Sequence, residues 1–312
     1  MMGRLTVGFM GSGRFAARCL EIISERVRPA WVLTNAPKTA GRGLKLQNTP
    51  VWELAGTLGL PVHTTEKLAA DRERLAWLGD NTPDVMLVID FGHIIKEPVL
   101  SMAPLGCLNI HPSRLPEYRG SAPIQRALMD GRTKTAVSIF RLDAGMDSGP
   151  ILAQPELEIL PEDNTATLME KAALLGAGTL LHYLCEAAPE DWHFTPQKEE
   201  NATAAPKIDK SEGKIDWRAD GAREIVNKIR GIGSSPGVYC AVRGKRLRVL
   251  AAEPLPSVAR EAGRCEIVEG MPVIACREGA LKLVEVQPEG KKPQRAADWA
   301  RGARIEKGEE IG

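Results

Sequence analysis

Short apolar runs alternate with stretches of helical periodicity along the first part of the chain. Residues 5–10 are mostly apolar and end in a glycine-rich turn, after which apolar residues recur at helical spacing. A second apolar run at 31–34 is followed by Thr49 and Pro50, which suit a helix N-cap and a first helical turn. The pattern therefore predicts a strand, a turn, a helix, another strand and another helix.

Two later runs, at 85–89 and 105–110, consist almost entirely of apolar residues. Such runs are typical of strands that helices bury on both faces. Because the strands alternate with helices, they predict a parallel sheet with crossover connections. We therefore expect a doubly wound α/β domain with a mostly parallel, Rossmann-like sheet.

The character of the chain changes after a long helix expected at 165–185. Residues 189–206 are rich in Pro, Glu, Asn and Ala, carry no apolar helical stripe and predict a linker. Beyond them, one helix at 219–229 and several short strands separated by Gly and Pro predict a small, OB-like β-barrel. We expect a first domain at 1–188, the linker, and a barrel domain at 207–312.

Composition narrows the class of protein. Of 312 residues, 43% are apolar and 26% are charged, which is ordinary for a globular protein. Only 4% are aromatic, which argues against a protein that binds single-stranded nucleic acid by stacking bases on aromatic rings. The six cysteines form no C-x-x-C pair and no zinc-site spacing. The sequence has no run long enough for a membrane span and no signal peptide. We expect a cytoplasmic protein that binds no metal and does not associate with a membrane.

The net charge of +1 conceals two unlike parts. Residues 1–206 hold 20 basic and 24 acidic residues, a net charge of −4, whereas residues 207–312 hold 21 and 16, a net charge of +5. Basic residues cluster in the barrel at Arg243, Lys245, Arg246 and Arg248. A small basic barrel can bind nucleic acid, although an ordinary solvated strand and turn has the same composition.

The first turn also matches a dinucleotide-binding motif. Gly11, Gly13 and Ala16 fit G-x-G-x-x-G/A between a strand and a helix. The second strand, however, ends at Asn35 without the acidic residue that would bind an adenosine ribose. The glycines then serve a tight turn and close helix packing, and a nicotinamide-dependent oxidoreductase remains a distant alternative.

Three polar side chains predict the chemistry. Asn109 and His111 are two residues apart on one strand and point to the same face at its carboxyl end, where open α/β sheets bind ligands. Asp147 follows another strand in a glycine-containing loop. The sequence has no G-x-S-x-G elbow and no phosphate-binding P-loop. The set suits acyl-type transfer between two bound substrates, with hydrogen-bond donors around a developing oxyanion.

The run LNIHPSRLPEYRGSAPIQRAL at 108–128, with the Asp147 loop, resembles the signature of the formyltransferases that use 10-formyltetrahydrofolate. Further stretches extend the resemblance to the branch that acts on methionyl-tRNA: FMGSGRFA at 9–16, AGRGLKL at 40–46, SEGKIDWRAD at 211–220, SSPGVY at 234–239 and GALKLVEVQPEGKKPQRAADWARG at 279–302. The resemblance implies formyl transfer to the amino group of methionyl initiator tRNA. A formyltransferase for a small amine, such as glycinamide ribonucleotide or an amino-sugar nucleotide, is the alternative.

The resemblance also implies residue roles. Asn109 would bind the formyl oxygen, His111 would stabilise the oxyanion, and Asp147 would orient His111 and help to move protons. The folate would contact a group of eight residues: Ser113, Arg114, Leu115, Pro116, Ile89, Asp90, Phe91 and Gly92.

The resemblance implies a tRNA-binding set as well. Arg42 would insert at the end of the acceptor stem. Further contacts would come from Lys45, Arg243, Lys245, Arg246 and Arg248. The family also leads us to expect a monomer. Arg114 and the pair Asp90-Phe91 depart from the family pattern, which has leucine and Ala-Tyr there, and so affect the expected folate contacts.

Overall fold

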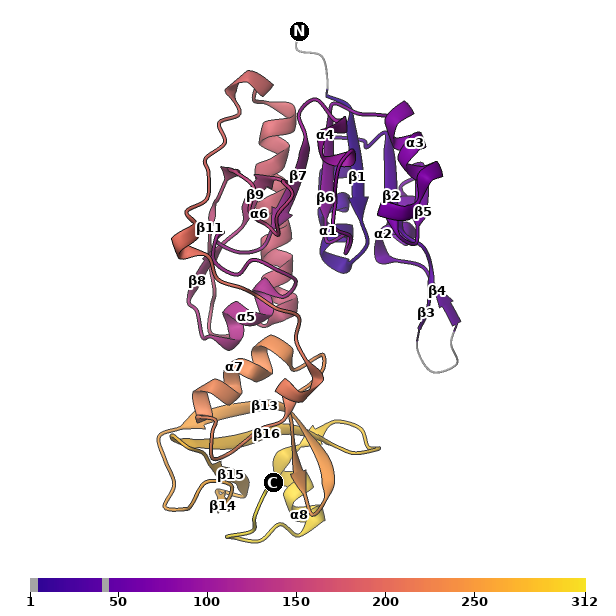
Figure 1. Cartoon of the computed structure of the whole chain (residues 1–312). Helices are drawn as coiled ribbons and strands as arrows, with labels where there is room; N and C mark the ends of the chain where they lie inside the picture. The colour runs from indigo at the N-terminus through magenta and orange to yellow at the C-terminus, as the bar shows by residue number, and fades with distance from the viewer. Residues whose placement is uncertain (1–4, 41–44) are drawn as a thin grey trace. The chain divides into compact units, whose positions relative to one another are not determined.

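The computed structural model (Figure 1) describes residues 5–40 and 45–312, and the chain divides into two compact units. The first unit consists of Met1–Gly120, Lys134–Glu158 and Thr167–Ala205. The second unit consists of Ser121–Thr133, Ile159–Ala166 and Pro206–Gly312. The second unit thus combines the C-terminal part of the chain with two short pieces from its middle.

A seven-stranded sheet forms the centre of the first unit, in the order β10-β9-β7-β6-β1-β2-β5. The strands from β7 to β5 are parallel, whereas β9 near one edge pairs antiparallel with both β7 and β10. Their bounds are β1 Val7–Gly11, β2 Trp31–Asn35, β5 Val62–Thr65, β6 Val85–Ile89, β7 Cys107–His111, β9 Ser138–Arg141 and β10 Ile151–Ala153. The predicted, mostly parallel α/β domain is confirmed.

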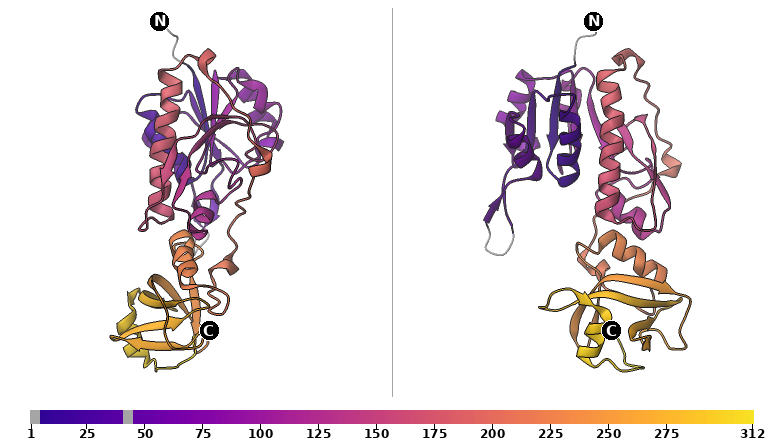
Figure 2. Two further views of the ribbon diagram at one scale, coloured as in Figure 1. Left: turned by 90° about the vertical axis from the view of Figure 1, so that its left-hand side faces the viewer. Right: turned by 180° about the vertical axis from the view of Figure 1, so that it is seen from behind.

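Helices lie on both faces of this sheet (Figure 2). The Thr49 hydroxyl caps α2 by accepting the Trp52 N–H at 3.0 Å, as the sequence predicted. On the long α6, a Cβ at Gly176 would lie 2.5 Å from Cγ2 of Ile110, so this glycine allows close packing against β7. The helices are α1 Arg14–Ser24, α2 Pro50–Thr57, α3 Arg72–Asp80, α4 Val99–Met102 and α6 Thr165–Cys185.

Short elements complete the first unit. Two small antiparallel pairs are β3 Lys38–Ala40 with β4 Lys45–Gln47, and β8 Lys134–Ala136 with β11 Glu156–Glu158. Short 3-10 turns are Leu68–Ala70, Pro189–Asp191 and Glu199–Asn201. Residues 195–205, in the predicted linker, form backbone bonds with this unit: Thr195 exchanges two bonds with Ile151, and Ala205 donates to the Arg119 carbonyl at 2.6 Å.

The second unit is built on an antiparallel sheet in the order β12-β13-β16-β15-β14, with β17 paired to β16. Its strands are β12 Tyr239–Val242, β13 Lys245–Leu255, β14 Cys265–Val268, β15 Met271–Ala275, β16 Ala280–Pro288 and β17 Gln294–Arg295. Its helices are α5 Pro123–Met129, α7 Ala222–Ile232 and α8 Ala296–Ala303, with a 3-10 turn at Lys210–Gly213. The predicted second, smaller β domain is confirmed.

Residues 308–312 join the two edges of this sheet. The Ile311 N–H donates to the Gly263 carbonyl beside β14, and Gly312 and Ala241 of β12 exchange two backbone bonds. The core beneath is apolar and includes Trp217 and Leu283.

The two middle pieces of the chain pack within this unit. Helix α5 contacts α7, where a Cβ at Gly231 would lie 2.8 Å from Cγ of Met129. Arg126 pairs with Glu212 at 2.5 Å, and the Thr165 hydroxyl donates to the Gly231 carbonyl.

Candidate active site

His111 ends β7 as a buried imidazole with two distinct nitrogens. Nε2 lies 2.9 Å from the Tyr118 carbonyl oxygen, which can only accept, so Nε2 carries the proton of this bond. Nδ1 faces the Asp147 carboxylate, with 3.8 Å between Nδ1 and Oδ2. The Phe140 ring stands edge-on to the imidazole. Nδ1 is therefore the nitrogen that is left to interact with reactants.

Asp147 is held in an uncommon backbone conformation, with φ of 51°. Its Oδ2 accepts the Gly120 N–H at 2.8 Å. Gly120 has φ of 125°, and a Cβ there would lie 2.7 Å from the Ala205 carbonyl oxygen, so only glycine fits. Residues from three parts of the chain thus fix the carboxylate beside His111.

The His111 and Asp147 side chains can act as a unit. The distance of 3.8 Å is longer than a direct hydrogen bond, and it can shorten when a substrate binds. A proton arriving at Nδ1 would create an imidazolium next to the carboxylate, with Nε2 already bonded to Tyr118. This arrangement can stabilise negative charge on a reactant and shuttle a proton.

Asn109 lies two residues before His111 on β7 and is half-buried. Between them, Ile110 faces Gly176 of α6, so strand alternation puts Asn109 and His111 on the opposite face. Cys107, on that same face, packs into the core with α4. The strand therefore presents an amide and an imidazole side by side at its carboxyl end.

The segment after His111 uses most of its polar groups within the chain. The buried Ser113 hydroxyl donates to the Glu117 carbonyl at 2.7 Å, and the Ser113 carbonyl accepts from Ser138. Leu115 is buried, and both its N–H and its carbonyl are hydrogen-bonded. The other two predicted folate contacts of this segment also have partners: Arg114 pairs with Glu156 at 2.6 Å, and the Pro116 carbonyl accepts the Thr203 N–H. Residues 113–116 therefore use these groups to hold the conformation of the chain next to His111.

The end of β6 explains the glycine-rich turn. Asp90, with φ of 44°, accepts the Ser12 and Gly13 N–H groups with its carbonyl and the Ala16 N–H with its carboxylate. A Cβ at Gly13 would overlap that carboxylate. Asp90 therefore caps α1, whose N-cap residue has no side chain, and occupies the place where a dinucleotide-binding turn would bind phosphate.

The protein around Asp90 alters its ionisation. Burial of the carboxylate against the turn at Gly13 raises the pKa of Asp90 to about 6, although the residue as a whole is exposed. The Ala16 N–H opposes this rise because it favours the ionised form. Of the neighbouring predicted contacts, Ile89 and Phe91 are buried and Gly92 is exposed with φ of 76°.

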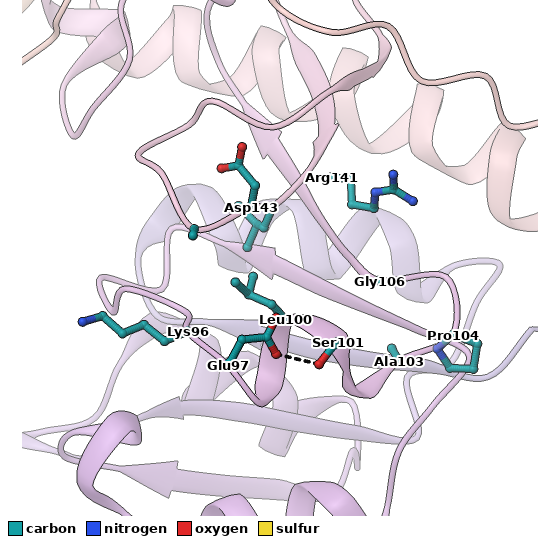
Figure 3. A pocket seen from close by; sticks show the side chains of 11 residues that line it. Lys96, Glu97, Leu100, Ser101, Ala103, Pro104, Gly106, Arg141 and Asp143 are labelled. Atoms are coloured by element: carbon teal, nitrogen blue, oxygen red, sulfur yellow. Dashed lines mark hydrogen bonds between the residues drawn. The ribbon is translucent and has the colours of Figure 1, made fainter.

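A cavity of about 920 Å³ opens beside the Asp147 loop (Figure 3). Lys96 lies at one end and Pro104 at the other, with Leu100 of α4 between them. Leu142, Asp143 and other residues of the loop after β9 form the opposite wall. None of the eight predicted folate residues lines it. The sequence could have located this side of the cavity, because Asp143 lies only four residues before Asp147 on the same loop.

The predicted tRNA contacts have mixed environments. Arg42 lies outside the described residues, and Lys45 begins β4. On the β12–β13 hairpin, Arg243 pairs with Glu309 and donates to two carbonyls, whereas Arg248 donates to the Gly233 carbonyl. Arg246 lies over the Tyr239 ring at 3.7 Å and is exposed, as is Lys245. The hairpin thus carries both structural and solvent-facing cations.

Residues 5–40 and 45–312 contain no group of three or more His, Cys, Asp or Glu residues that could hold a metal ion. No helix in these ranges is both long and apolar enough to cross a membrane.

Sequence comparison identifies similar proteins for both parts of the chain. The formyl transferase family matches residues 6–184, and the formyl transferase C-terminal domain family matches residues 207–304. The methionyl-tRNA formyltransferase of Paracoccus denitrificans is 39% identical over 302 residues, 96% of this chain and 97% of the relative. That of Jannaschia sp. is 40% identical over 305 residues, with the same coverage.

Structure comparison finds the same fold. An N-formyltransferase from Helicobacter canadensis, solved in complex with folinic acid and dTDP-3-aminofucose, has a TM-score of 0.66 at 16% sequence identity. The match covers 91% of this chain and 99% of that chain. At this identity the similarity concerns the fold.

Proposed function

Because the chain belongs to the formyl transferase family, through its methionyl-tRNA formyltransferase branch, we propose that it formylates the amino group of methionyl initiator tRNA. The donor is 10-formyltetrahydrofolate. The observation that carries this proposal is the identity of 39–40% to curated enzymes over almost the whole length of the chain. The oxidoreductase alternative loses its support, since Asp90 fills the turn on which it rested.

The residues around His111 would carry the transfer. The methionyl amine attacks the formyl carbon, a new C–N bond forms, and the formyl oxygen gains negative charge. Asn109 would donate a hydrogen bond to that oxygen, and a protonated Nδ1 of His111 would offset its charge. Asp147 would favour that imidazolium and keep the ring in place, because its carboxylate faces Nδ1.

The proton balance closes within the site. When the bond between the formyl carbon and N10 breaks, the attacking nitrogen must lose a proton and N10 must gain one. Asp147 and His111 lie close enough to relay that proton through a water. The products are the N-formyl amide and tetrahydrofolate, so no metal or redox step is required.

The cavity beside the Asp147 loop suits the folate donor, which supplies the formyl group. Its wall combines apolar side chains, such as Leu100 and Leu142, with the cations Lys96 and Arg141. The planar ring system of a folate would pack on the apolar side chains, and the carboxylates of its glutamate tail would pair with the cations. Residues 142–144 of its wall belong to the same loop as Asp147.

For the acceptor, the basic second unit would bind phosphates of the tRNA, with Lys245 and Arg246 as exposed cations of the hairpin. Arg42 and Lys45 would contact the acceptor stem. We also propose that the enzyme is a cytoplasmic monomer, with a catalytic domain at 1–188 joined through 189–206 to a tRNA-binding domain.

An amine-competition assay tests the function. The chain is supplied with 10-formyltetrahydrofolate and methionyl initiator tRNA, glycinamide ribonucleotide or an amino-sugar nucleotide, and the formylated products are identified by mass. We expect formylmethionyl-tRNA as the main product. Turnover of another amine without formylation of the tRNA would overturn the proposal.

A further inference from the structure

The side chain of Gln197 contacts the backbone of the Asp147 loop. Its Nε2 donates to the Asp147 carbonyl at 2.8 Å and to the Gly149 carbonyl at 2.7 Å. Both bonds are charge-neutral and short, and they span the turn in which Asp147 sits. Gln197 is half-buried, whereas its neighbours Lys198 and Glu199 are exposed.

The orientation of the Gln197 amide follows from its partners. Its Oε1 accepts two N–H groups of the Arg119 guanidinium, from Nε at 3.1 Å and from Nη2 at 2.8 Å. A flipped amide would set N–H against N–H and oxygen against oxygen, so one orientation satisfies all four bonds. Arg119 is in turn fixed by Glu199, which pairs with it at 2.7 Å.

Asp147 needs such support, because a non-glycine residue at φ of 51° persists only where surrounding contacts hold it. The Gly120 N–H holds the carboxylate, and Gln197 holds the carbonyl of the same residue. One bond holds the side chain of Asp147 and the other holds its backbone, so the carboxylate has little freedom to move relative to His111.

We infer that Gln197 is a positioning residue for the formyl transfer, because its amide sets the place of Asp147 opposite His111. This inference rests on the proposed function. It also gives residues 195–205 a role beyond connection: Gln197 holds the Asp147 loop, and Thr203 accepts the Tyr118 N–H with its hydroxyl at 2.8 Å. The Tyr118 carbonyl bonds His111, so one segment supports both sides of the catalytic pair.

The test is a substitution that removes all four hydrogen bonds of the amide, the two donated and the two accepted, and keeps the bulk. For Gln197→Met we expect kcat to fall about 10- to 100-fold, since a small displacement of a catalytic group has effects of that size. The KM values for folate and tRNA should change less than about threefold, because the side chain contacts neither proposed binding surface. Gln197→Glu has nearly the same shape but no hydrogen-bond donors, so it should show the same fall in kcat. This second variant keeps the inference testable if Gln197→Met fails to fold.

A matched control places the same new side chain on the same segment. Lys198→Met changes an exposed position one residue away and should keep kcat and KM close to those of the unmodified chain. Thermal melting of all variants reports on folding. If Lys198→Met lowered kcat as much as Gln197→Met does, or if Gln197→Met and Gln197→Glu kept full kcat, the positioning role would be wrong.

A double-mutant cycle distinguishes failure of this inference from failure of the proposed function. Residues that act as a unit are non-additive, so Gln197→Met should have little further effect once Asp147→Asn is present. Additive losses would mean that Gln197 acts elsewhere and would overturn the inference alone. A full kcat for Asp147→Asn would instead refute the catalytic role of Asp147 on which both rest.

Discussion

Nδ1 of His111 lies 3.8 Å from Oδ2 of Asp147, while Nε2 of the same ring is bonded to the Tyr118 carbonyl. The imidazole is thus fixed at one nitrogen and faces a carboxylate at the other. A protonated ring in this position has a counter-charge on the side of Nδ1 and a hydrogen-bond acceptor on the side of Nε2. The geometry joins orientation and charge stabilisation in two residues, one at the end of β7 and one in the loop after β9.

Removing the Asp147 charge is therefore expected to slow the chemical step. Asp147→Asn should lower kcat about 100-fold or more, the range seen when one charge-stabilising group is lost, while the KM for folate changes little. Steady-state formylation of methionyl-tRNA measures both constants. A kcat within threefold of the unmodified chain would contradict the assigned role, provided that the variant melts at a similar temperature.

The packing of Gly13 against Asp90 predicts a destabilising substitution and its rescue. Gly13→Ala brings a Cβ into the Asp90 carboxylate and should lower the free energy of unfolding by about 1–3 kcal/mol in urea denaturation. Adding Asp90→Ala removes the overlap and should restore part of that loss. Gly178→Ala is the control, because nothing lies within 4 Å of a Cβ there; in mid-helix it should be neutral or stabilising. Equal losses at both glycines would contradict the overlap.

The raised pKa of Asp90 predicts how stability depends on pH. Its pKa is about 6 in the fold against an ordinary value of 3.8, so folding takes up a proton between these values. This carboxyl therefore lowers the free energy of unfolding as pH rises from about 4 to about 6. Asp90→Asn removes the titration, so its stability relative to the unmodified chain should increase across that window in urea denaturation.

Asp84 provides the control of opposite sign. Its carboxylate accepts the Thr6 hydroxyl and the Thr6 N–H, both at 2.7 Å, and these bonds lower its pKa. Its contribution is present above the ordinary pKa and is lost as pH falls below it. The stability of Asp84→Asn relative to the unmodified chain should therefore be flat above about pH 5. If both variants had the same pH profile, the environment assigned to Asp90 would be wrong.

The cations of the hairpin should divide into two classes when they are replaced. Lys245→Ala removes an exposed charge, so it should raise the KM for tRNA and reduce the salt dependence of tRNA binding by about one unit of slope. Arg243→Ala removes a pair with Glu309 and two bonds to carbonyls, so it should lower the free energy of unfolding by about 1 kcal/mol. Filter binding over a salt series and urea denaturation separate the two effects. A change in stability without a change in binding at Lys245 would contradict this division.

Local patterns in the sequence predicted the elements that carry the site. The apolar run at 85–89 coincides with β6, and the helix expected at 165–185 coincides with α6. Alternation along β7 correctly placed Asn109 and His111 on one face, because a strand repeats every two residues. These features depend on neighbours in the sequence, which is why the sequence reveals them.

Other features depend on residues that meet only in the folded chain. The Asp90 carboxylate caps a helix that begins 76 positions earlier, and no local pattern marks that pairing. Gln197 lies 50 residues after Asp147 in a stretch without periodicity, so the sequence indicated only a linker. The strand expected before the Asp147 loop is β9, but its antiparallel direction and the short strand β10 were not foreseen, because both depend on pairing between distant segments.

The composition of the second unit has a consequence for domain exchange. Helix α5 and residues 159–166 come from the middle of the chain, yet Arg126 pairs with Glu212 and Thr165 bonds Gly231 inside this unit. A graft of residues 207–312 onto another enzyme would leave those partners behind and expose the face of α7 that they cover. The basic domain is thus not a self-contained cassette, and exchanging it between enzymes requires recombination at several points in the gene.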